Sequence, residues 1–383
     1  MATHQHRRRA GSSRHLCVTL SYAAFTAAFI ENAPTAVLPS LASSLGVSES
    51  TAVWSRAVFA GTAAITAIPV VHATRRLVRR DLVVTSAIVL LISSVFLLST
   101  TDLMAHLVMR GAAGLAAGVM WSVIGGYAYS FAPAGRHAAY LTAALFGGTL
   151  SIAIAIPLAA TLRSWHATVA TSAALAAALV IAVLLFAPHT HLEPAKRPAA
   201  EKKSATTWPV IVLLAIVMLL GGAAHNATAS ALTLTMPANA PVAFTSLGLA
   251  SLAGGIGAIV LLHRHLLALT ITMSALMVAG YAILSTQSHA ASAVILGCTL
   301  WGLGWGPLPA AVQAIATGVA STPDTANATQ LVGYNVGLTL GPLALILVIP
   351  EITPLVSLGT ACLATMGIVL VAVLNKQVKN RAR

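Results

Sequence analysis

The stretch ATVATSAALAAALVIAVLLFA, residues 167–187, contains no acidic or basic side chain. A helix needs about 20 consecutive apolar residues to cross the hydrocarbon core of a bilayer. Backbone groups in hydrocarbon must find hydrogen-bond partners inside the protein, so an apolar run of this length is expected to be helical. The stretch therefore predicts a transmembrane helix, and its length is the length expected of the other membrane spans in the chain.

Outward from this stretch, apolar runs of similar length fill most of the 383 residues. The composition agrees, because 58% of the residues are hydrophobic and only 8% are charged, against about 25% charged in soluble domains. The pattern is not the alternating ten-residue strands of a membrane barrel. We predict an all-α membrane protein with twelve transmembrane helices. The other eleven predicted spans are 16–38, 52–73, 82–100, 103–130, 138–161, 208–233, 243–262, 266–286, 290–318, 326–350 and 353–374.

One long polar segment, residues 189–207, separates the first six predicted helices from the last six. It contains four basic residues and two prolines, and we interpret it as a cytoplasmic linker. The chain is thus expected to consist of an N-terminal six-helix half, residues 1–188, and a C-terminal six-helix half, residues 208–383.

A faint internal repeat supports the division into halves. Gly148 and Pro157 in the fifth predicted helix have the same spacing as Gly333 and Pro342 in the eleventh. These helices occupy equivalent places in the two halves, as duplicated transporter halves predict.

Basic residues are distributed unevenly between the predicted loops. With the N-terminus in the cytoplasm, 18 of the 21 Lys and Arg residues fall in cytoplasmic segments, and the exceptions are Arg56, Arg110 and Arg163. This asymmetry predicts a multi-pass protein of the cell inner membrane with both termini cytoplasmic. The same distribution explains the net charge of +13 without nucleic-acid binding.

The first apolar run has two interpretations. Several arginines precede residues 16–30, as in a cleavable secretion signal. The run continues through residues 36–41, which makes it long enough to span. We therefore expect an uncleaved first helix.

Glu31 lies midway through this first span, in the sequence FIENAP, residues 29–34. An ionised carboxylate there costs about 2.5–3.5 kcal/mol on insertion scales, so it should face a cavity or a partner. Burial favours the neutral, protonated form of a carboxyl group, which makes Glu31 a candidate proton carrier. Asn32 beside it is a candidate substrate contact. The alternative is a structural Glu31 that is hydrogen-bonded to a neighbouring helix.

Arg110 is a basic residue in the fourth predicted span. An arginine cannot lose its proton and must find a carboxylate, carbonyl groups or water. Gly111, Gly114 and Gly118 would let another helix approach closely. Arg110 is thus a candidate proton-coupling residue, and the alternative is a side chain that extends to the outer surface. A pair with Glu31 would favour the charged carboxylate and oppose the effect of burial.

Candidate substrate contacts in the second half are polar and aromatic, since its spans contain no acidic or basic residue. Aromatic side chains around a central cavity would suit a flat apolar or amphipathic substrate. Each has an alternative role in ordinary helix packing or interfacial anchoring. The candidates are His225, Asn226, Trp301, Trp305, Tyr334 and Asn335, joined by Trp121 of the fourth span.

The basic turn between the second and third predicted helices is a candidate gating loop on the cytoplasmic face, through Arg76, Arg79, Arg80 and Asp81. Its alternative role is that of a topology signal alone.

Enzymatic chemistry finds no support in the sequence. A phosphate-binding glycine motif, a metal-ligand spacing and a nucleophile–base arrangement are all missing. We therefore expect no enzyme, no cofactor and no metal. The cysteines, Cys17, Cys298 and Cys362, are interpreted as small core residues.

These positions resemble the major facilitator superfamily, specifically its twelve-span drug:proton antiporters and sugar-efflux permeases. The acid of the first helix and the Arg110–Gly114–Gly118 spacing are similar to motifs of that group. The resemblance implies the major facilitator fold and a proton-coupling role for Arg110. The other similar segments are the helix-five motif with Gly148 and Pro157, Trp301 to Gly304 in helix ten, and Asn335 to Gly337 in helix eleven.

Two departures from the superfamily pattern bear on the mechanism. In the loop between helices two and three, Arg75 stands where the superfamily usually has Asp, and Val78 where it has Gly. This loop therefore lacks the acid of the usual salt bridge. In helix five, Ala155 replaces a glycine before the proline.

The leading hypothesis is a proton-coupled exporter of a small amphipathic drug or metabolite. Two halves would rock about a central cavity while Glu31 exchanges a proton for substrate. Substrate, protons and the lipid bilayer are the expected partners of a monomer. The alternatives are a sugar or nucleoside exporter or uniporter, against which the few polar residues argue, and a membrane sensor that does not transport.

Overall fold

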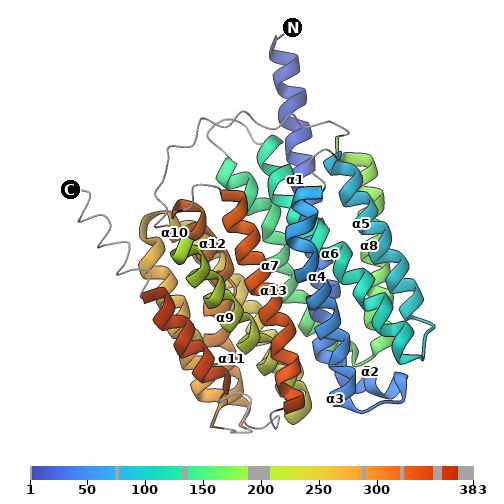
Figure 1. The fold of residues 1–383 in the computed structure, drawn as a ribbon, viewed down its shortest axis with the longest axis vertical. Coiled ribbons are helices and arrows are strands. Elements are labelled where there is room, and N and C mark those ends of the chain that lie inside the picture. Colours follow the sequence, from blue (N-terminus) through green and yellow to red (C-terminus); the bar gives the residue numbers. More distant parts are fainter. Residues whose placement is uncertain are drawn as a thin grey trace.

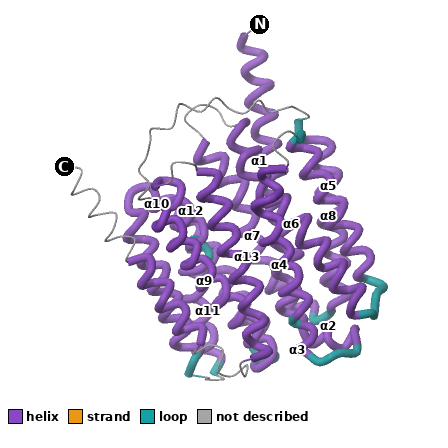
Figure 2. The backbone as a smooth tube through the Cα atoms, viewed as in Figure 1, coloured by secondary structure: helices purple, strands orange, loops and turns teal. Residues whose placement is uncertain are grey.

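The computed structural model describes residues 2–73, 77–131, 137–188, 208–286, 290–319, 323–347 and 356–369. Each element in these ranges is a helix (Figure 2). The elements are α1 (Ala2–Asn32), η1 (Ala33–Val37), α2 (Leu38–Leu45), α3 (Glu49–Ala52), α4 (Trp54–Ala73), α5 (Arg79–Leu97), α6 (Leu103–Phe131), α7 (His137–Leu162), α8 (Trp165–Phe186), α9 (Trp208–Thr235), α10 (Ala240–Leu284), α11 (Ala291–Trp305), α12 (Leu308–Val319) and α13 (Pro323–Leu347), followed by a shorter helix, Val356–Val369.

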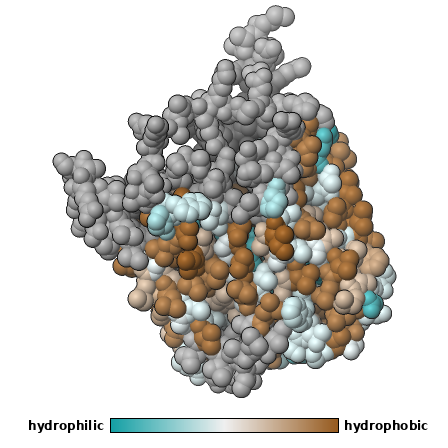
Figure 3. Space-filling model, in the orientation of Figure 1, coloured by the Kyte–Doolittle hydropathy of each residue, from teal (hydrophilic) through white to brown (hydrophobic). Residues whose placement is uncertain are grey.

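The predicted membrane helices are present. Nine segments of the described chain are long and apolar enough to cross a membrane. The three remaining predicted spans correspond to α4, α13 and the shorter helix Val356–Val369. Large apolar side chains such as Ile65, Ile92 and Leu185 are exposed on the outside of the bundle, and the described face in Figure 3 is mostly hydrophobic. The prediction of an all-α membrane protein with twelve spans is confirmed.

The first span is broken at Pro34. The helix α1 ends at Asn32, the short 3-10 helix η1 follows, and α2 resumes the path at Leu38. Proline lacks a backbone N–H and cannot continue the hydrogen-bond ladder of an α-helix, which explains the break. Glu31 therefore lies in the last turn before an interruption of the first membrane span.

The spans predicted at 243–262 and 266–286 form one helical element, α10, that folds back on itself. Its first arm places Gly254 against Leu303 of α11, while its second arm places Met273 against Gly304. In a straight helix residues 254 and 273 would be about 28 Å apart. The two arms therefore lie side by side along α11.

Glycines allow helix pairs on either side of residues 189–207 to approach closely. The described residues before this segment are called the first half below, and those after it the second half. In the first half, Gly147 of α7 lies against the backbone of Ser21 in α1. In the second half, Gly333, Gly337 and Gly341 of α13 lie against the backbone of α9. Lipid supplies no hydrophobic force between helices, so this close backbone contact is a main source of their association.

The helices before and after residues 189–207 also contact each other. Helix α4 contacts α13, and helix α7 contacts α10. Figure 1 shows α4 beside α13. A Cβ atom at Gly61 would lie 3.5 Å from the side chain of Thr339, and one at Gly248 would lie 2.8 Å from Ala153. The predicted linker itself lies outside the described residues.

The end of the bundle opposite the N-terminus is closed by direct contact between helices of the two halves. Both η1 and α2 contact α9 there. Thr233 of α9 donates a hydrogen bond through Oγ1 to the backbone oxygen of Thr35 at 2.9 Å. The polar residues described next lie close to this closure.

Candidate functional site

Glu31 is buried near the contact between the halves. Its side chain is 7% exposed, and its Oε1 atom is buried without a hydrogen-bond partner among the described residues. A structural carboxylate would have that oxygen hydrogen-bonded to a neighbouring helix, since an unpaired buried polar atom is costly. The geometry instead leaves one oxygen free for a proton, water or ligand.

Arg110 points into the bundle. Its side chain is 2% exposed, so it does not extend to the outer surface. Nε donates to the backbone oxygen of Ser55 at 3.2 Å, and Nη1 donates to that of Ile30 at 3.1 Å. The guanidinium also lies 4.5 Å from the ring centre of Phe59, a cation–π contact. These partners hold Arg110 next to the peptide that precedes Glu31.

Arg56 is a site residue that the sequence analysis assigned no role. It lies in the first turn of α4 and is 3% exposed. Nη1 donates to Ser230 Oγ at 3.1 Å, and Nη2 donates to Asn226 Oδ1. Both acceptors are on α9, so Arg56 joins the two halves through its side chain. Its third nitrogen, Nε, is buried without a partner among the described residues.

The two guanidinium groups act on the same carboxyl group. Arg56 and Arg110 both interact electrostatically with Glu31 across the buried interior. Two fixed positive charges and one carboxylate give this part of the site a net charge of +1 when Glu31 is ionised and +2 when it is protonated. The site therefore carries positive charge in either state.

An aromatic group continues the site into the second half. The rings of His225 and Trp305 stack with their centres 4.4 Å apart and an interplanar angle of 14°. Trp301 meets His225 edge-on at 5.1 Å, and Tyr334 stacks on Trp305 at 6.0 Å. Asn226, which accepts from Arg56, is next in the chain to His225, which connects the aromatic group to the charges. The charged–aromatic patch is the set Glu31, Arg56, Arg110, His225, Asn226, Trp301, Trp305 and Tyr334.

Three predicted substrate contacts are not joined to this patch by any described interaction. Asn32 and Asn335 are buried, and each donates from Nδ2 to a carbonyl of its own helix, at Ala28 and Leu331 respectively. Trp121 packs between α6 and α7, where its ring lies against Gly148. Their predicted role in substrate binding stays a prediction.

The predicted gating loop is described in part. Arg76 lies outside the described residues, while Arg79, Arg80 and Asp81 begin α5. Arg80 donates from Nη2 to the backbone oxygen of Leu184 at 2.9 Å, which ties the start of α5 to the end of α8 in the same half. The helix-five proline, Pro157, lies inside α7 without ending it.

A second buried histidine, which the sequence analysis did not select, adjoins the site. His106 Nε2 and Ser55 Oγ are 2.8 Å apart, and the backbone oxygen of the same serine accepts from Arg110. The His106 ring packs on Trp165 at 5.3 Å. Both residues sit in the first half, so they support Arg110 rather than the contact between halves.

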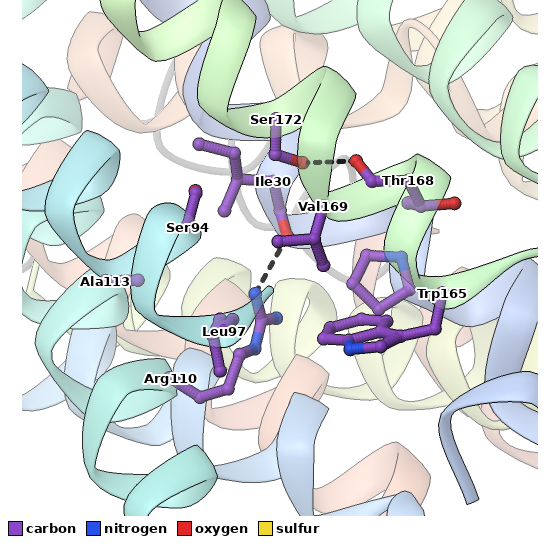
Figure 4. A pocket seen from close by; sticks show the side chains of 10 residues that line it. Ile30, Ser94, Leu97, Arg110, Ala113, Trp165, Thr168, Val169 and Ser172 are labelled. Carbon is purple, nitrogen blue, oxygen red and sulfur yellow. Dashed lines mark hydrogen bonds between the residues drawn. The ribbon is translucent and has the colours of Figure 1, made fainter. Parts of the chain in front are cut away.

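A small cavity lies beside Arg110, inside the first half (Figure 4). Its volume of ≈ 10 Å³ leaves room for about one water molecule. It is lined by Ile30, Ser94, Trp165 and Val169 among others, and the hydroxyl of Ser94 donates to the carbonyl of Leu90 in its own helix. This cavity is too small for a substrate.

Metal chemistry is not suggested by the described residues, which contain no cluster of three or more His, Cys, Asp or Glu side chains able to hold an ion. Buried charges between membrane-spanning helices are typical of secondary transporters. The sequence matches the family model of the Major Facilitator Superfamily over residues 20–342. The chain belongs to this superfamily, whose members are transporters and not enzymes, and the predicted fold and superfamily are confirmed.

Solved transporters have the same fold at low sequence identity. A POT family transporter in complex with a thioalcohol-conjugated peptide is 12% identical, with a TM-score of 0.74, over 94% of this chain and 96% of that one. The nucleoside transporter NupG is 13% identical, with a TM-score of 0.68, over 93% of this chain and 99% of that one. A comparison with curated proteins found no match. These likenesses establish the fold, and the drug-antiporter subgroup stays a prediction.

Proposed function

We propose that this chain couples the transport of a small amphipathic molecule to a proton, and that Glu31 binds the proton. The observation that carries the proposal is the buried carboxyl with a free Oε1, close to the guanidinium groups of Arg56 and Arg110. A carboxyl is the group in this patch that can change its charge, because arginine stays protonated. Intramembrane acids of this kind mark proton relays in transporters.

The proposed coupling runs through the hydrogen bonds between the halves. With Glu31 protonated and neutral, Arg56 donates to Asn226 and Ser230, and the end of the bundle opposite the N-terminus is held closed. With Glu31 ionised, its carboxylate competes for Arg56 and weakens these bonds. Loss of the proton then favours opening of this end, and binding of a proton favours closure.

The proposed motion is a rocking of residues 1–188 against residues 208–383. The distribution of basic residues supports cytoplasmic termini, and with that orientation the closed end faces outward. A proton taken from the outside would then close the outer end and be released inside. The chain acts as a monomer in this scheme, since each half already finds its partner within the chain.

The proposed substrate surface is the aromatic part of the patch. His225, Trp301, Trp305 and Tyr334 offer flat apolar faces, with Asn226 as a polar contact beside them. Such a surface supports an amphipathic substrate over a sugar, which needs many hydrogen-bonding side chains. The resemblance to antiporters implies efflux by exchange. In such an exchange the transporter binds the proton and the substrate alternately.

Gradient-driven transport in proteoliposomes tests the proposal. Purified protein is reconstituted, a pH gradient is imposed, and accumulation of a panel of amphipathic compounds is compared with that in protein-free vesicles. Glu31→Gln should abolish gradient-driven accumulation and keep downhill exchange, while Glu49→Gln, at an exposed acid of α3, should behave as wild type. Undiminished accumulation in Glu31→Gln would remove Glu31 from the mechanism, and a sensor would give no flux at all.

A further inference from the structure

We infer that the substrate is an organic anion with an aromatic or flat apolar body, bound by the charged–aromatic patch. The inference rests on the proposed function and adds the chemical class of its substrate. It is carried by the unpaired hydrogen-bond donors of the patch, by its fixed positive charge, and by the continuity of its charged and aromatic parts.

The buried atoms that lack partners in the patch are mostly donors. Arg56 Nε, Arg110 Nη2, Trp301 Nε1 and Trp305 Nε1 are buried and have no hydrogen-bond partner in the described part of the chain. Arginine and indole nitrogens can only donate. Among the other unpaired atoms of the patch, Glu31 Oε1 accepts when the carboxyl is ionised, and His225 Nδ1 donates or accepts according to its tautomer. A ligand that satisfies this surplus of donors must bring acceptor oxygens, as a carboxylate does.

The charges select the same class of ligand. Because Arg56 and Arg110 stay positive, the patch repels a cation whether Glu31 is ionised or protonated. An anion is attracted in both states, and more strongly when Glu31 is neutral. A guanidinium binds a carboxylate through short charge-assisted hydrogen bonds that a neutral ligand cannot make.

One ligand of small size can reach both parts of the patch. Asn226, which accepts from Arg56, is next in the chain to His225, which stacks on Trp305. A carboxylate placed at Arg56 therefore brings an attached ring to the aromatic faces of His225 and Trp305.

The sign of the coupling follows from these charges. A bound anion stabilises the protonated, neutral form of Glu31, because the carboxylate would otherwise compete with it for the guanidinium groups. Linkage is reciprocal, so a proton on Glu31 tightens anion binding. Proton and anion then bind together. For a substrate of this class the inference therefore departs from the exchange proposed above and favours transport of proton and anion in the same direction.

Binding of matched compounds tests the inference. The full chain in lipid nanodiscs is titrated by calorimetry with benzoate, salicylate, naphthoate and indoleacetate, each beside its neutral amide and the corresponding amine. At least one carboxylate should bind about tenfold more tightly than its amide, as a charged hydrogen bond predicts. Its affinity should fall as pH rises and Glu31 ionises, and the amine should bind most weakly.

Variants locate the effect. Arg56→Gln should remove the preference for the anion, Arg56→Lys should keep part of it, and Glu31→Gln should keep the preference while removing its dependence on pH. The wild-type pH profile needs no variant, so the test holds even where a variant fails to fold. If no carboxylate of the panel binds more tightly than its amide, or if the amine binds best, the inference is overturned.

These binding data, together with the proteoliposome transport assay described above, separate this inference from the proposed function. Anion preference without accompanying proton movement would support the substrate class and contradict Glu31 as the coupling group. Proton-driven transport of neutral or cationic compounds without anion preference would support the coupling role of Glu31 and contradict the inferred substrate class.

Discussion

Arg56, in the first turn of α4, donates a hydrogen bond to Asn226, in the middle of α9, across the contact between the two halves. Ser230, one turn further along α9, accepts from the same guanidinium at 3.1 Å. A charged donor with two acceptors on the opposite half is well suited to hold one conformation closed. In the proposed mechanism, a proton on Glu31 changes the strength of these hydrogen bonds.

Removal of this guanidinium should loosen the closed end. A buried hydrogen bond to a charged group contributes about 1.5–3 kcal/mol, so Arg56→Gln should raise the open population about tenfold or more. The measurement is the rate at which a membrane-impermeant maleimide labels Thr233→Cys in the same protein. Arg163→Gln, at an exposed arginine, is the matched control and should leave the rate unchanged. Equal rates in both variants would contradict a closing role for Arg56.

A covalent link at the closed end should stop transport. Thr233 Oγ1 lies 2.9 Å from the backbone oxygen of Thr35, so the two positions are in direct contact in this conformation. In a chain whose native cysteines are changed to alanine, Thr35→Cys with Thr233→Cys, joined by a short bis-thiol reagent, should lose flux. Each single cysteine variant treated with the same reagent should keep it. Full transport by the linked protein would show that this end need not open.

Much of the architecture follows from the sequence, because a segment that crosses the hydrocarbon core must be apolar and must pair its backbone groups internally. Runs of about 20 apolar residues must be helices there, and this predicted the twelve spans. The break after Glu31 occurs at Pro34 and the gap between α11 and α12 at Pro307, two prolines that the sequence analysis did not interpret as interruptions of its predicted spans 16–38 and 290–318. The sequence predicted two separate spans at 243–262 and 266–286. The structure joins them in one helical element, α10, which folds back between the two predicted spans.

The site was predicted in part, for a physical reason. Glu31 and Arg110 were selected because a charge inside an apolar run is visible in one dimension. Arg56 sits at the edge of its span, and its role depends on Asn226, 170 positions away along the chain. The sequence did contain a signal for Arg56, because an arginine within a membrane span requires a partner. The stacking of His225 on Trp305 is likewise a contact between distant helices that no local pattern encodes.

A side chain at Gly114 should destabilise the first half. A Cβ atom there would collide with the backbone oxygen of Phe59 and the hydroxyl of Thr62 on α4. Gly114→Ala should lower the free energy of unfolding by about 1–3 kcal/mol, the usual cost of overpacking. Thermal unfolding in detergent measures the change. Gly257→Ala is the control, because a Cβ at Gly257 meets nothing within 4 Å. Equal melting temperatures for the two variants would be the contrary result.

The stacked indole of Trp305 should contribute directly to substrate affinity. An aromatic pair contributes about 0.5–1.5 kcal/mol beyond the area that it buries, so Trp305→Leu should weaken binding of a transported compound about two- to tenfold. Trp305→Phe should recover part of the loss. Trp208→Phe, at a tryptophan that is 51% exposed, controls for general effects on the protein. Binding constants from calorimetry decide the matter, and unchanged affinity in Trp305→Leu would exclude the aromatic faces from the substrate surface.

The protonation of Glu31 itself is the most direct measurement of the central claim. Infrared difference spectra of the reconstituted protein, recorded across a pH titration, should contain the carbonyl band of a protonated carboxyl that appears as pH falls. The account predicts that this band is missing in Glu31→Gln, persists in Glu49→Gln, and changes when a transported compound is added. A titrating band that survives in Glu31→Gln, or one that ignores the substrate, would contradict the account.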